Sequence, residues 1–306
     1  MTELILHNYP NSPFAEKIRL ILGFKGLDWR SVQIPRVLPK PDLLPLTGGY
    51  RKTPVMQIGA DVYCDSSCIA RELEQRHPAP SLFPDDSHGV ATMLGAWADR
   101  TLFFDVVGVV FGTLGNMVPK DLREDRLRFS GGVMDLDRYQ SEQPQLRSQL
   151  RAHLFWIERA FDDGRPFLLG PMPTWADFCC YSPVWMVQGR VPELKMLDDM
   201  PRTRAWFERM TAFGHGRPTE LEAKEALRIA HGTAPEAVQL GHPEAPDGFV
   251  AGVPVTVAAD DYGKDPVAGT IVSMNAQTVV LRRADPVVGE VNVHFPRAGF
   301  VLAKAA

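Results

Sequence analysis

The sequence predicts an α+β protein of three parts: a βαβαββα domain over residues 1–80, an all-helical domain over residues 88–232 and a small β-barrel over residues 245–306. Three observations predict this division. Short apolar runs alternate with capped helical segments in the first part, and long helical stripes without strand signals fill the second. In the third part, β-branched residues return at a spacing of two.

Composition narrows the classes of partner. The chain has 33 basic and 37 acidic residues, so its net charge of -4 gives no general attraction to phosphate backbones or anionic lipid. Nucleic acid and membranes are therefore not expected partners. The most apolar stretch, Leu102–Val118, contains Asp105 and is shorter than the ~20 residues that span a bilayer. The start, Met1-Thr2-Glu3, lacks a positive leader region, so a cytoplasmic location is expected.

The first domain opens with an apolar run at residues 3–9, which Pro10 stops as it would a buried strand. Ser12 followed by Pro13 predicts a helix start, because serine caps free amides and proline is tolerated in the first turn. That helix should end near Gly26. A second strand is expected at residues 29–34.

A proline-rich connection over residues 35–49 allows only short helical pieces. The segment 53–58 then predicts a strand entered through Pro54, and a turn at residues 59–61 makes a hairpin with Val62-Tyr63. Asp65-Ser66 opens a helix that runs to about His77, where two prolines follow.

Long helices dominate after residue 88. The first is expected over residues 88–115, and further helices at residues 202–213 and 217–231. A helix near residue 150 carries one apolar stripe that should be core: Leu146, Leu150, Leu154, Ile157 and Phe161. Thr174 and Asp177 have the spacing of a capping box at the start of another helix, which Pro183 should kink.

The stretch 232–248 has the composition of a linker. Beyond it we expect a separate β-module with strands at 253–257, 267–274, 278–283, 290–295 and 300–302. His294 lies on one of these strands, where a structural hydrogen bond is the favoured role.

Three motifs stand in order along the first domain: Asn11-Ser12-Pro13-Phe14-Ala15-Glu16-Lys17-Ile18-Arg19, then Thr53-Pro54-Val55, then Asp65-Ser66-Ser67-Cys68-Ile69. Together they resemble the glutathione transferase family, most closely its serine-type classes. The resemblance covers about residues 3–231, and the Thr174/Asp177 pair matches the family's helical domain. It implies a thioredoxin-like first domain, a homodimer, and a detoxifying transferase that uses glutathione as co-substrate. The part from residue 245 has no counterpart in that resemblance.

The resemblance implies that Ser12 stabilises the thiolate of bound glutathione. A free thiol has a pKa of ~8.5, so glutathione needs help to ionise at neutral pH. A hydroxyl at a helix N-terminus can donate a hydrogen bond to sulfur while the helix dipole adds positive potential. Two alternatives stay open: Ser12 only caps its helix, or Tyr9 donates the hydrogen bond instead.

The resemblance also implies the residues that hold the tripeptide. Pro54 should follow a cis peptide bond, so that Val55 pairs its main chain with glutathione; a trans bond is the alternative. Asp65 and Ser66 should receive the γ-glutamyl carboxylate at a helix N-terminus, unless Asp65 is a plain cap. Lys40 should bind the glycyl carboxylate.

The expected electrophile pocket lies between the first two domains. Trp97, Arg100 and Phe104 are its candidates at helical spacing, and Tyr9 is a further candidate; core packing is an alternative role for each. The four cysteines show no zinc spacing and are expected to be buried thiols, and no metal is expected.

The leading hypothesis is a glutathione transferase that acts on a small hydrophobic electrophile. A glutathione-transferase-like binding or scaffold protein and a glutathione-dependent isomerase or dehalogenase are the alternatives.

Overall fold

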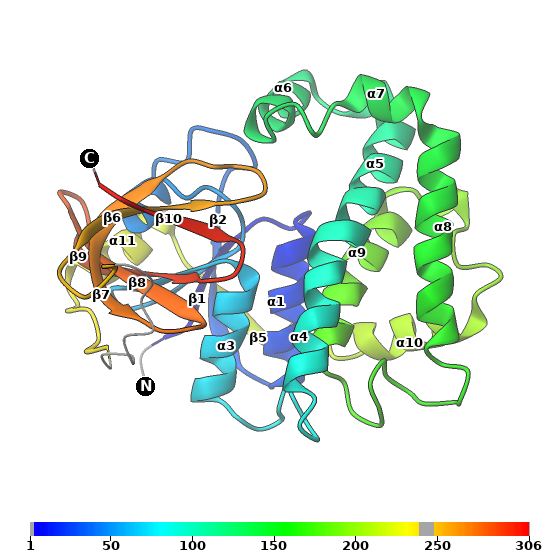
Figure 1. Cartoon of the computed structure of the whole chain (residues 1–306), viewed down its shortest axis with the longest axis horizontal. Helices are drawn as coiled ribbons and strands as arrows, with labels where there is room; N and C mark the ends of the chain where they lie inside the picture. The colour runs from blue at the N-terminus through cyan, green and yellow to red at the C-terminus, as the bar shows by residue number, and fades with distance from the viewer. Residues whose placement is uncertain (1–2, 239–247, 306) are drawn as a thin grey trace. The chain divides into compact units, whose positions relative to one another are not determined.

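The computed structural model describes residues 3–238 and 248–305, which form two compact units (Figure 1). The first unit comprises Met1–Ile18, Leu27–Leu73 and Arg217–Ala306; the second comprises Arg19–Gly26 and Glu74–Gly216. The expected boundaries at 80, 88, 232 and 245 stay a prediction, since the two units combine segments from different parts of the chain.

The first unit contains the predicted βαβαββα order. Its elements are β1 (Ile5–Asn8), α1 (Pro13–Phe24), β2 (Asp28–Gln33), α2 (Leu44–Thr47), β3 (Val55–Ile58), β4 (Asp61–Cys64) and α3 (Ser66–Arg76). Strand β1 pairs in parallel with β2 and antiparallel with β3, and β3 pairs antiparallel with β4. The last residues of α1 and α3 are counted with the second unit.

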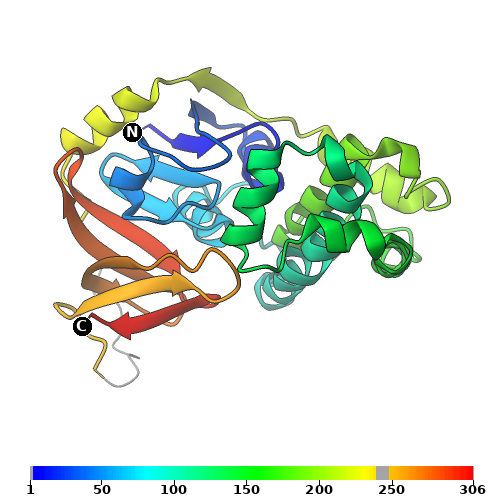
Figure 2. The same cartoon turned by 90° about the horizontal axis from the view of Figure 1, so that it is seen from above.

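Segments from the end of the chain extend this sheet at both edges. Strand β5 (Arg217–Glu220) pairs in parallel with β2, and α11 (Ala223–His231) follows it. Five more strands continue the sheet from β4: β6 (Pro254–Ala259), β7 (Val267–Met274), β8 (Thr278–Asp285), β9 (Gly289–Pro296) and β10 (Phe300–Lys304). The order is β10-β6-β7-β8-β9-β4-β3-β1-β2-β5, and Figure 2 shows the orange and red strands beside the blue ones.

All five predicted C-terminal strands are present, and we call β6 to β10 the C-terminal module. Its strands do not close into a hydrogen-bonded ring among the described residues, because β9 uses its free edge to pair in parallel with β4.

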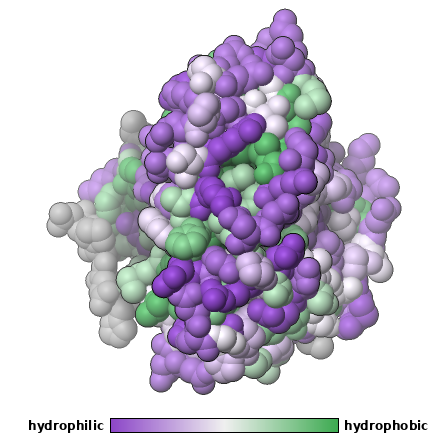
Figure 3. Space-filling model, turned by 90° about the vertical axis from the view of Figure 1, so that its right-hand side faces the viewer, coloured by the Kyte–Doolittle hydropathy of each residue, from purple (hydrophilic) through white to green (hydrophobic). Residues whose placement is uncertain are grey.

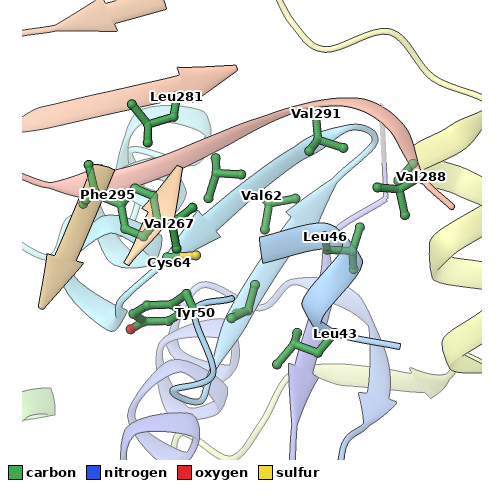
Figure 4. Packing of buried hydrophobic residues seen from close by; sticks show 14 of the residues in the cluster. Leu43, Leu46, Tyr50, Val62, Cys64, Val267, Leu281, Val288, Val291 and Phe295 are labelled. Carbon is green, nitrogen blue, oxygen red and sulfur yellow. The ribbon is translucent and has the colours of Figure 1, made fainter. Parts of the chain in front are cut away.

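One hydrophobic core joins the C-terminal module to strands β1 to β4 of the sheet. Val62 and Cys64 of β4 pack in the same cluster as Val267, Leu281 and Phe295 of the module (Figure 4). Leu43 and Leu46, at α2, close another side of this cluster. Apolar surface buried between the two parts stabilises both, so the module is an integral part of this unit.

The second unit is helical. Its helices are α4 (His88–Trp97), α5 (Phe103–Leu114), α6 (Lys120–Phe129), α7 (Leu136–Ser141), α8 (Gln143–Arg159), α9 (Trp175–Arg190) and α10 (Pro201–Thr211). Four of the five residues of the predicted stripe are core: Leu150 and Leu154 are fully buried on α8, Ile157 is buried, and Phe161 beyond the helix end packs 6.0 Å from Trp206, ring centre to ring centre. Leu146, at the start of the stripe, is half-buried. Figure 3 shows a largely hydrophilic face on the side of α8, with apolar residues reaching the surface in small patches.

The capping box at α9 is confirmed. The Thr174 main-chain N–H donates to Asp177 Oδ2 at 2.8 Å, and Pro183 lies inside the helix. Asp177 also accepts hydrogen bonds from Leu168 N and Trp206 Nε1, so one buried carboxylate joins three segments.

Three sequence expectations differ from the structure. Residues 217–220 form strand β5 rather than the start of a helix, and the place of β5 at the sheet edge tolerates Pro218. The expected helix over 88–115 is interrupted by a π-helical turn at Ala98–Leu102. Helices α6 and α7 were not expected. None of the described helices, before residue 239 or after residue 247, is long and apolar enough to cross a bilayer.

Candidate functional site

The sheet register brings the three sequence motifs to one end of the first unit. His7 of β1 is level with Val55 of β3, and Val55 is level with Cys64 of β4. Strand β3 runs antiparallel to both neighbours, so its start lies beside the ends of β1 and β4. The segments that carry Ser12, Pro54 and Ser66 therefore adjoin one another.

Ser12 stands directly before α1. Its Oγ accepts a hydrogen bond from the main-chain N–H of Ala15 at 3.2 Å, which is the predicted capping role. Its own N–H donates to the carbonyl of Tyr9 at 3.2 Å, and the side chain is 2% exposed. A hydroxyl that accepts a hydrogen bond keeps its proton for a further acceptor, so Ser12 can cap α1 and still donate.

Lys40 connects Tyr9 to the segment before Pro54. Its Nζ lies 5.9 Å from the centre of the Tyr9 ring. It donates to the carbonyl of Arg51 at 2.9 Å and to Thr53 Oγ1 at 3.3 Å. Lys40 is buried, so its charge is held at a defined place next to Thr53.

The peptide bond between Thr53 and Pro54 is cis, as the resemblance implies. Val55, however, is the first residue of β3 and has a partner in β1 and another in β4. A strand with neighbours on both sides has no open edge for a further peptide. Thr53, one residue before Pro54, lies outside the strand and was not singled out from the sequence.

Asp65 and Ser66 form the start of α3. Asp65 has a φ of 78°, and its Oδ1 accepts hydrogen bonds from the N–H of Ser67 at 2.8 Å and the hydroxyl of Ser67 at 2.7 Å. The carboxylate of Asp65 is therefore a helix cap. The Oγ of Ser66 accepts a hydrogen bond from Lys17 Nζ at 3.2 Å.

Lys17 is a buried cation that the sequence reasoning missed. It is fully buried on α1, with Nζ 4.7 Å from the centre of the Phe14 ring. A sequence signal for it exists, because Phe14, Lys17 and Ile21 lie on one helical face and Ile21 is core. A lysine on such a face is buried and must meet polar partners.

The three pocket candidates of the helical unit lie between the end of α4 and the start of α5. Trp97 ends α4 and contacts His153 and Trp156 of α8, with ring centres 5.6 Å and 6.0 Å away. Arg100 is exposed on the π-helical turn, and Phe104 is half-buried at the start of α5. Trp97 thus has packing partners of its own.

The cysteines and histidines outside this site have structural environments. All four cysteines are buried free thiols, as predicted, and burial raises the pKa of Cys64 and Cys68 well above the ordinary range. His294 Nε2 lies 2.7 Å from Asp61 Oδ1, which confirms a structural hydrogen bond. Within the described ranges, no group of three or more metal-ligating side chains is found.

Comparison with known proteins agrees with this geometry. The N-terminal domain model of glutathione S-transferases matches residues 6–81, and the C-terminal domain model matches residues 121–209. A glutathione S-transferase-like protein from Pseudomonas syringae is 39% identical, with a TM-score of 0.79, and the match covers 100% of both chains. That match therefore includes the C-terminal module.

Two further relatives are more distant. FtsZ-localized protein A of Caulobacter vibrioides is 24% identical over 223 residues, which are 71% of this chain and 90% of that protein. A glutathione S-transferase from Methylobacterium radiotolerans, solved in complex with glutathione sulfonate, is 22% identical with a TM-score of 0.53. That match covers 72% of this chain and 98% of the other, and it shows a shared fold.

Proposed function

This chain belongs to the glutathione S-transferase superfamily, and from that premise we propose that it binds glutathione and ionises its thiol for attack on a hydrophobic electrophile. The observation that carries the proposal is the meeting of Ser12, the Lys40–Thr53 contact and the Ser66–Lys17 contact at one end of β1, β3 and β4. Glutathione sulfonate in the Methylobacterium relative supports the same ligand class.

Ser12 is the proposed thiolate donor. Its hydroxyl donates to the sulfur while the N-terminus of α1 adds positive potential, and both effects favour the anion. The thiolate then forms a bond to an electrophilic carbon, and either a leaving group departs with its electron pair or the thiolate adds to an activated double bond. The proton released from the thiol goes to solvent. Tyr9 is the alternative donor.

Charge complementarity supports the placement of the two ends of the tripeptide. Lys40 is the proposed partner of the glycyl carboxylate. Ser66, with Lys17 behind it and the N-terminus of α3 beside it, is the proposed site of the γ-glutamyl carboxylate. Asp65 orients that helix start. Since Val55 lies between two strands, the main chain of Thr53 is the proposed partner of the cysteinyl residue.

Trp97, Arg100 and Phe104, with Tyr9, are the proposed contacts of the electrophile. Aromatic side chains and one cation among these candidates suit a planar apolar substrate that carries a partial negative charge. A homodimer with a cytoplasmic detoxifying role is part of the same proposal, by family resemblance.

The test is retention on immobilised glutathione and elution with the free tripeptide, followed by assays of conjugation, isomerisation and dehalogenation. We expect retention and turnover of at least one substrate class. A protein that passes through the column and shows no binding heat with glutathione would contradict the proposal.

The second candidate is a binding protein that kept the fold without turnover. The similarity to FtsZ-localized protein A favours it, because the name of that relative refers to localization with FtsZ and not to a reaction. Glutathione binding without activity on any substrate class would favour this alternative. An isomerase or dehalogenase would use the same thiolate, so glutathione binding alone cannot distinguish it from a transferase. The assay for each reaction makes that distinction.

A further inference from the structure

The loop over residues 260–266, between β6 and β7, contacts the segment that precedes Pro54. Lys52 Nζ lies 2.6 Å from Asp261 Oδ1 and 4.0 Å from the centre of the Tyr262 ring. Arg51 Nε lies 3.4 Å from Asp265 Oδ2. Two consecutive cations before Pro54 are therefore neutralised by the C-terminal module, about 210 residues further along the chain in sequence.

The rest of the same segment is also held by the module. The Tyr50 ring packs against Phe295, with ring centres 5.9 Å apart (Figure 4). It also packs against Phe300, whose ring centre lies 6.2 Å away. Arg283 of β8 donates a hydrogen bond to the carbonyl of Pro45. At Gly48 the φ of 72° favours glycine, and an added Cβ would lie 2.6 Å from Arg283 Nε, so the side chain of Arg283 lies directly against this turn.

This segment carries the proposed glycyl end of the glutathione site. Lys40 Nζ is fixed by the carbonyl of Arg51 and by Thr53 Oγ1, on either side of Lys52. Any shift of residues 51–53 would move Lys40 and the Thr53 main chain together. Through Lys52, the module thus holds residues 51–53 in place, next to the two groups that would contact the ligand, Lys40 and the Thr53 main chain.

Burial distinguishes the two ion pairs. The side chains of Lys52 and Asp261 are 14% and 26% exposed, and Asp261 Oδ1 also accepts from the N–H of Tyr262 at 2.6 Å. Asp265 is 54% exposed. A partly buried, hydrogen-bonded pair is screened less by water than an exposed one, so Asp261 is the member of the loop that holds the segment.

We propose that the 260–266 loop is a wall of the glutathione site, in which Asp261 is a positioning residue that sets Lys52, Thr53 and Lys40 for the glycyl end of the tripeptide. The inference rests on the proposed function. It gives the C-terminal module a role in ligand choice: it favours γ-glutamyl thiols that end in glycine over γ-glutamylcysteine, which lacks that residue.

The test is calorimetric titration of the full chain with glutathione and with γ-glutamylcysteine. Asp261→Asn should raise the Kd for glutathione by about fivefold to tenfold, as expected when a charge-assisted hydrogen bond is lost, and leave that for γ-glutamylcysteine nearly unchanged. Asp261→Glu should restore most of the preference. Glu290→Gln removes another ion pair of the same module, with Arg282, and should leave both Kd values unchanged.

The preference between the two thiols is the decisive quantity, because a partly unfolded sample lowers the number of sites for both equally. Lys52→Gln leaves the module's sequence intact and should reproduce the loss of preference. Glutathione binding by the native chain with an unchanged preference in Asp261→Asn and Lys52→Gln would overturn this inference alone. No binding of either thiol by the native chain would overturn the proposed function and the inference with it.

Discussion

Ser12→Ala is the perturbation that bears most directly on the proposed chemistry. The substitution removes one hydroxyl and leaves the start of α1 otherwise unchanged. Two interactions are lost: the hydrogen bond that Oγ accepts from Ala15 N at 3.2 Å, and the proposed donation to the glutathione sulfur. These two losses have separate readouts, because the first acts on folding and the second on the bound thiol.

The magnitudes follow from the partners. Loss of a serine cap costs about 1 kcal/mol of folding free energy. A hydrogen bond to a charged group contributes roughly 1.5–3 kcal/mol. Since 1.36 kcal/mol corresponds to one pKa unit, the pKa of the bound thiol should rise by about one to two units in the variant.

The assay is ultraviolet titration of the thiolate in the glutathione complex, together with the pH dependence of kcat/KM. Below both pKa values the thiolate fraction of the variant should be lower by roughly 10-fold to 100-fold. The loss should shrink as pH rises, and it should vanish above the variant's own pKa. The rate profile therefore shifts to higher pH.

Two controls separate this effect from folding. Ser12→Thr keeps a hydroxyl and a cap, so the pKa of the bound thiol should stay near the native value. Ser130→Ala removes another buried hydroxyl, which accepts from Met134 N at 2.8 Å in the helical unit, and should leave that pKa unchanged. An unchanged pKa in Ser12→Ala with glutathione still bound would refute the assignment and favour Tyr9.

Three further predictions concern stability. Burial lowers the pKa of His7 to about 4, so the contribution of its neutral form to the free energy of unfolding should be complete above pH 6.5. The free energy of unfolding should fall by about 3 kcal/mol as pH drops toward 4. Urea unfolding at several pH values should show this slope, and His7→Leu should reduce it. Asp177→Ala leaves buried donors of Leu168, Thr174 and Trp206 unpaired, so denaturant unfolding should show a loss of roughly 3–5 kcal/mol, whereas Asp163→Ala at an exposed pair should change little. Removal of residues 233–306 uncovers the β4 edge and the core around Val62, so the shortened chain should aggregate or lose its cooperative thermal transition; a soluble chain with the native transition would contradict the shared core.

The local elements of the fold could be predicted because their signals lie within a few residues of each other. Ser12 caps a helix through an amide three residues away, and Thr174 with Asp177 does the same for α9. Alternating β-branched residues also predicted each strand of the C-terminal module. Such signals act over one helical turn or one strand, where the sequence itself fixes the spacing.

The long-range pairings could not be predicted in the same way. Strand β9 pairs with β4, and β5 pairs with β2, although each partner is far away in sequence. The alternation of apolar and polar residues along a strand predicts which of its faces is buried. It does not predict which neighbouring strand it will pair with. The contact between Lys52 and Asp261 depends on the pairing of β9 with β4, so it could not be predicted for a C-terminal module that was expected to be separate.

The site shows the same division. Ser12, Asp65 and Ser66 follow from helix starts, and the structure places them at adjoining strand ends. The proposed main-chain partner of glutathione is Thr53 rather than Val55, and this change depends on the strand register. Val55 pairs with β1 and with β4, so it has no open edge. Lys17 could have been found, since its place between Phe14 and Ile21 on an apolar face marks it as buried.

A crystal structure of the chain with bound glutathione would locate the sulfur and both carboxylates of the tripeptide. We expect the sulfur within hydrogen-bonding distance of Ser12 Oγ, the γ-glutamyl carboxylate at Ser66, and the glycyl carboxylate at Lys40. A tripeptide whose sulfur lies against Tyr9 Oη, or one bound away from the start of α1, would contradict it.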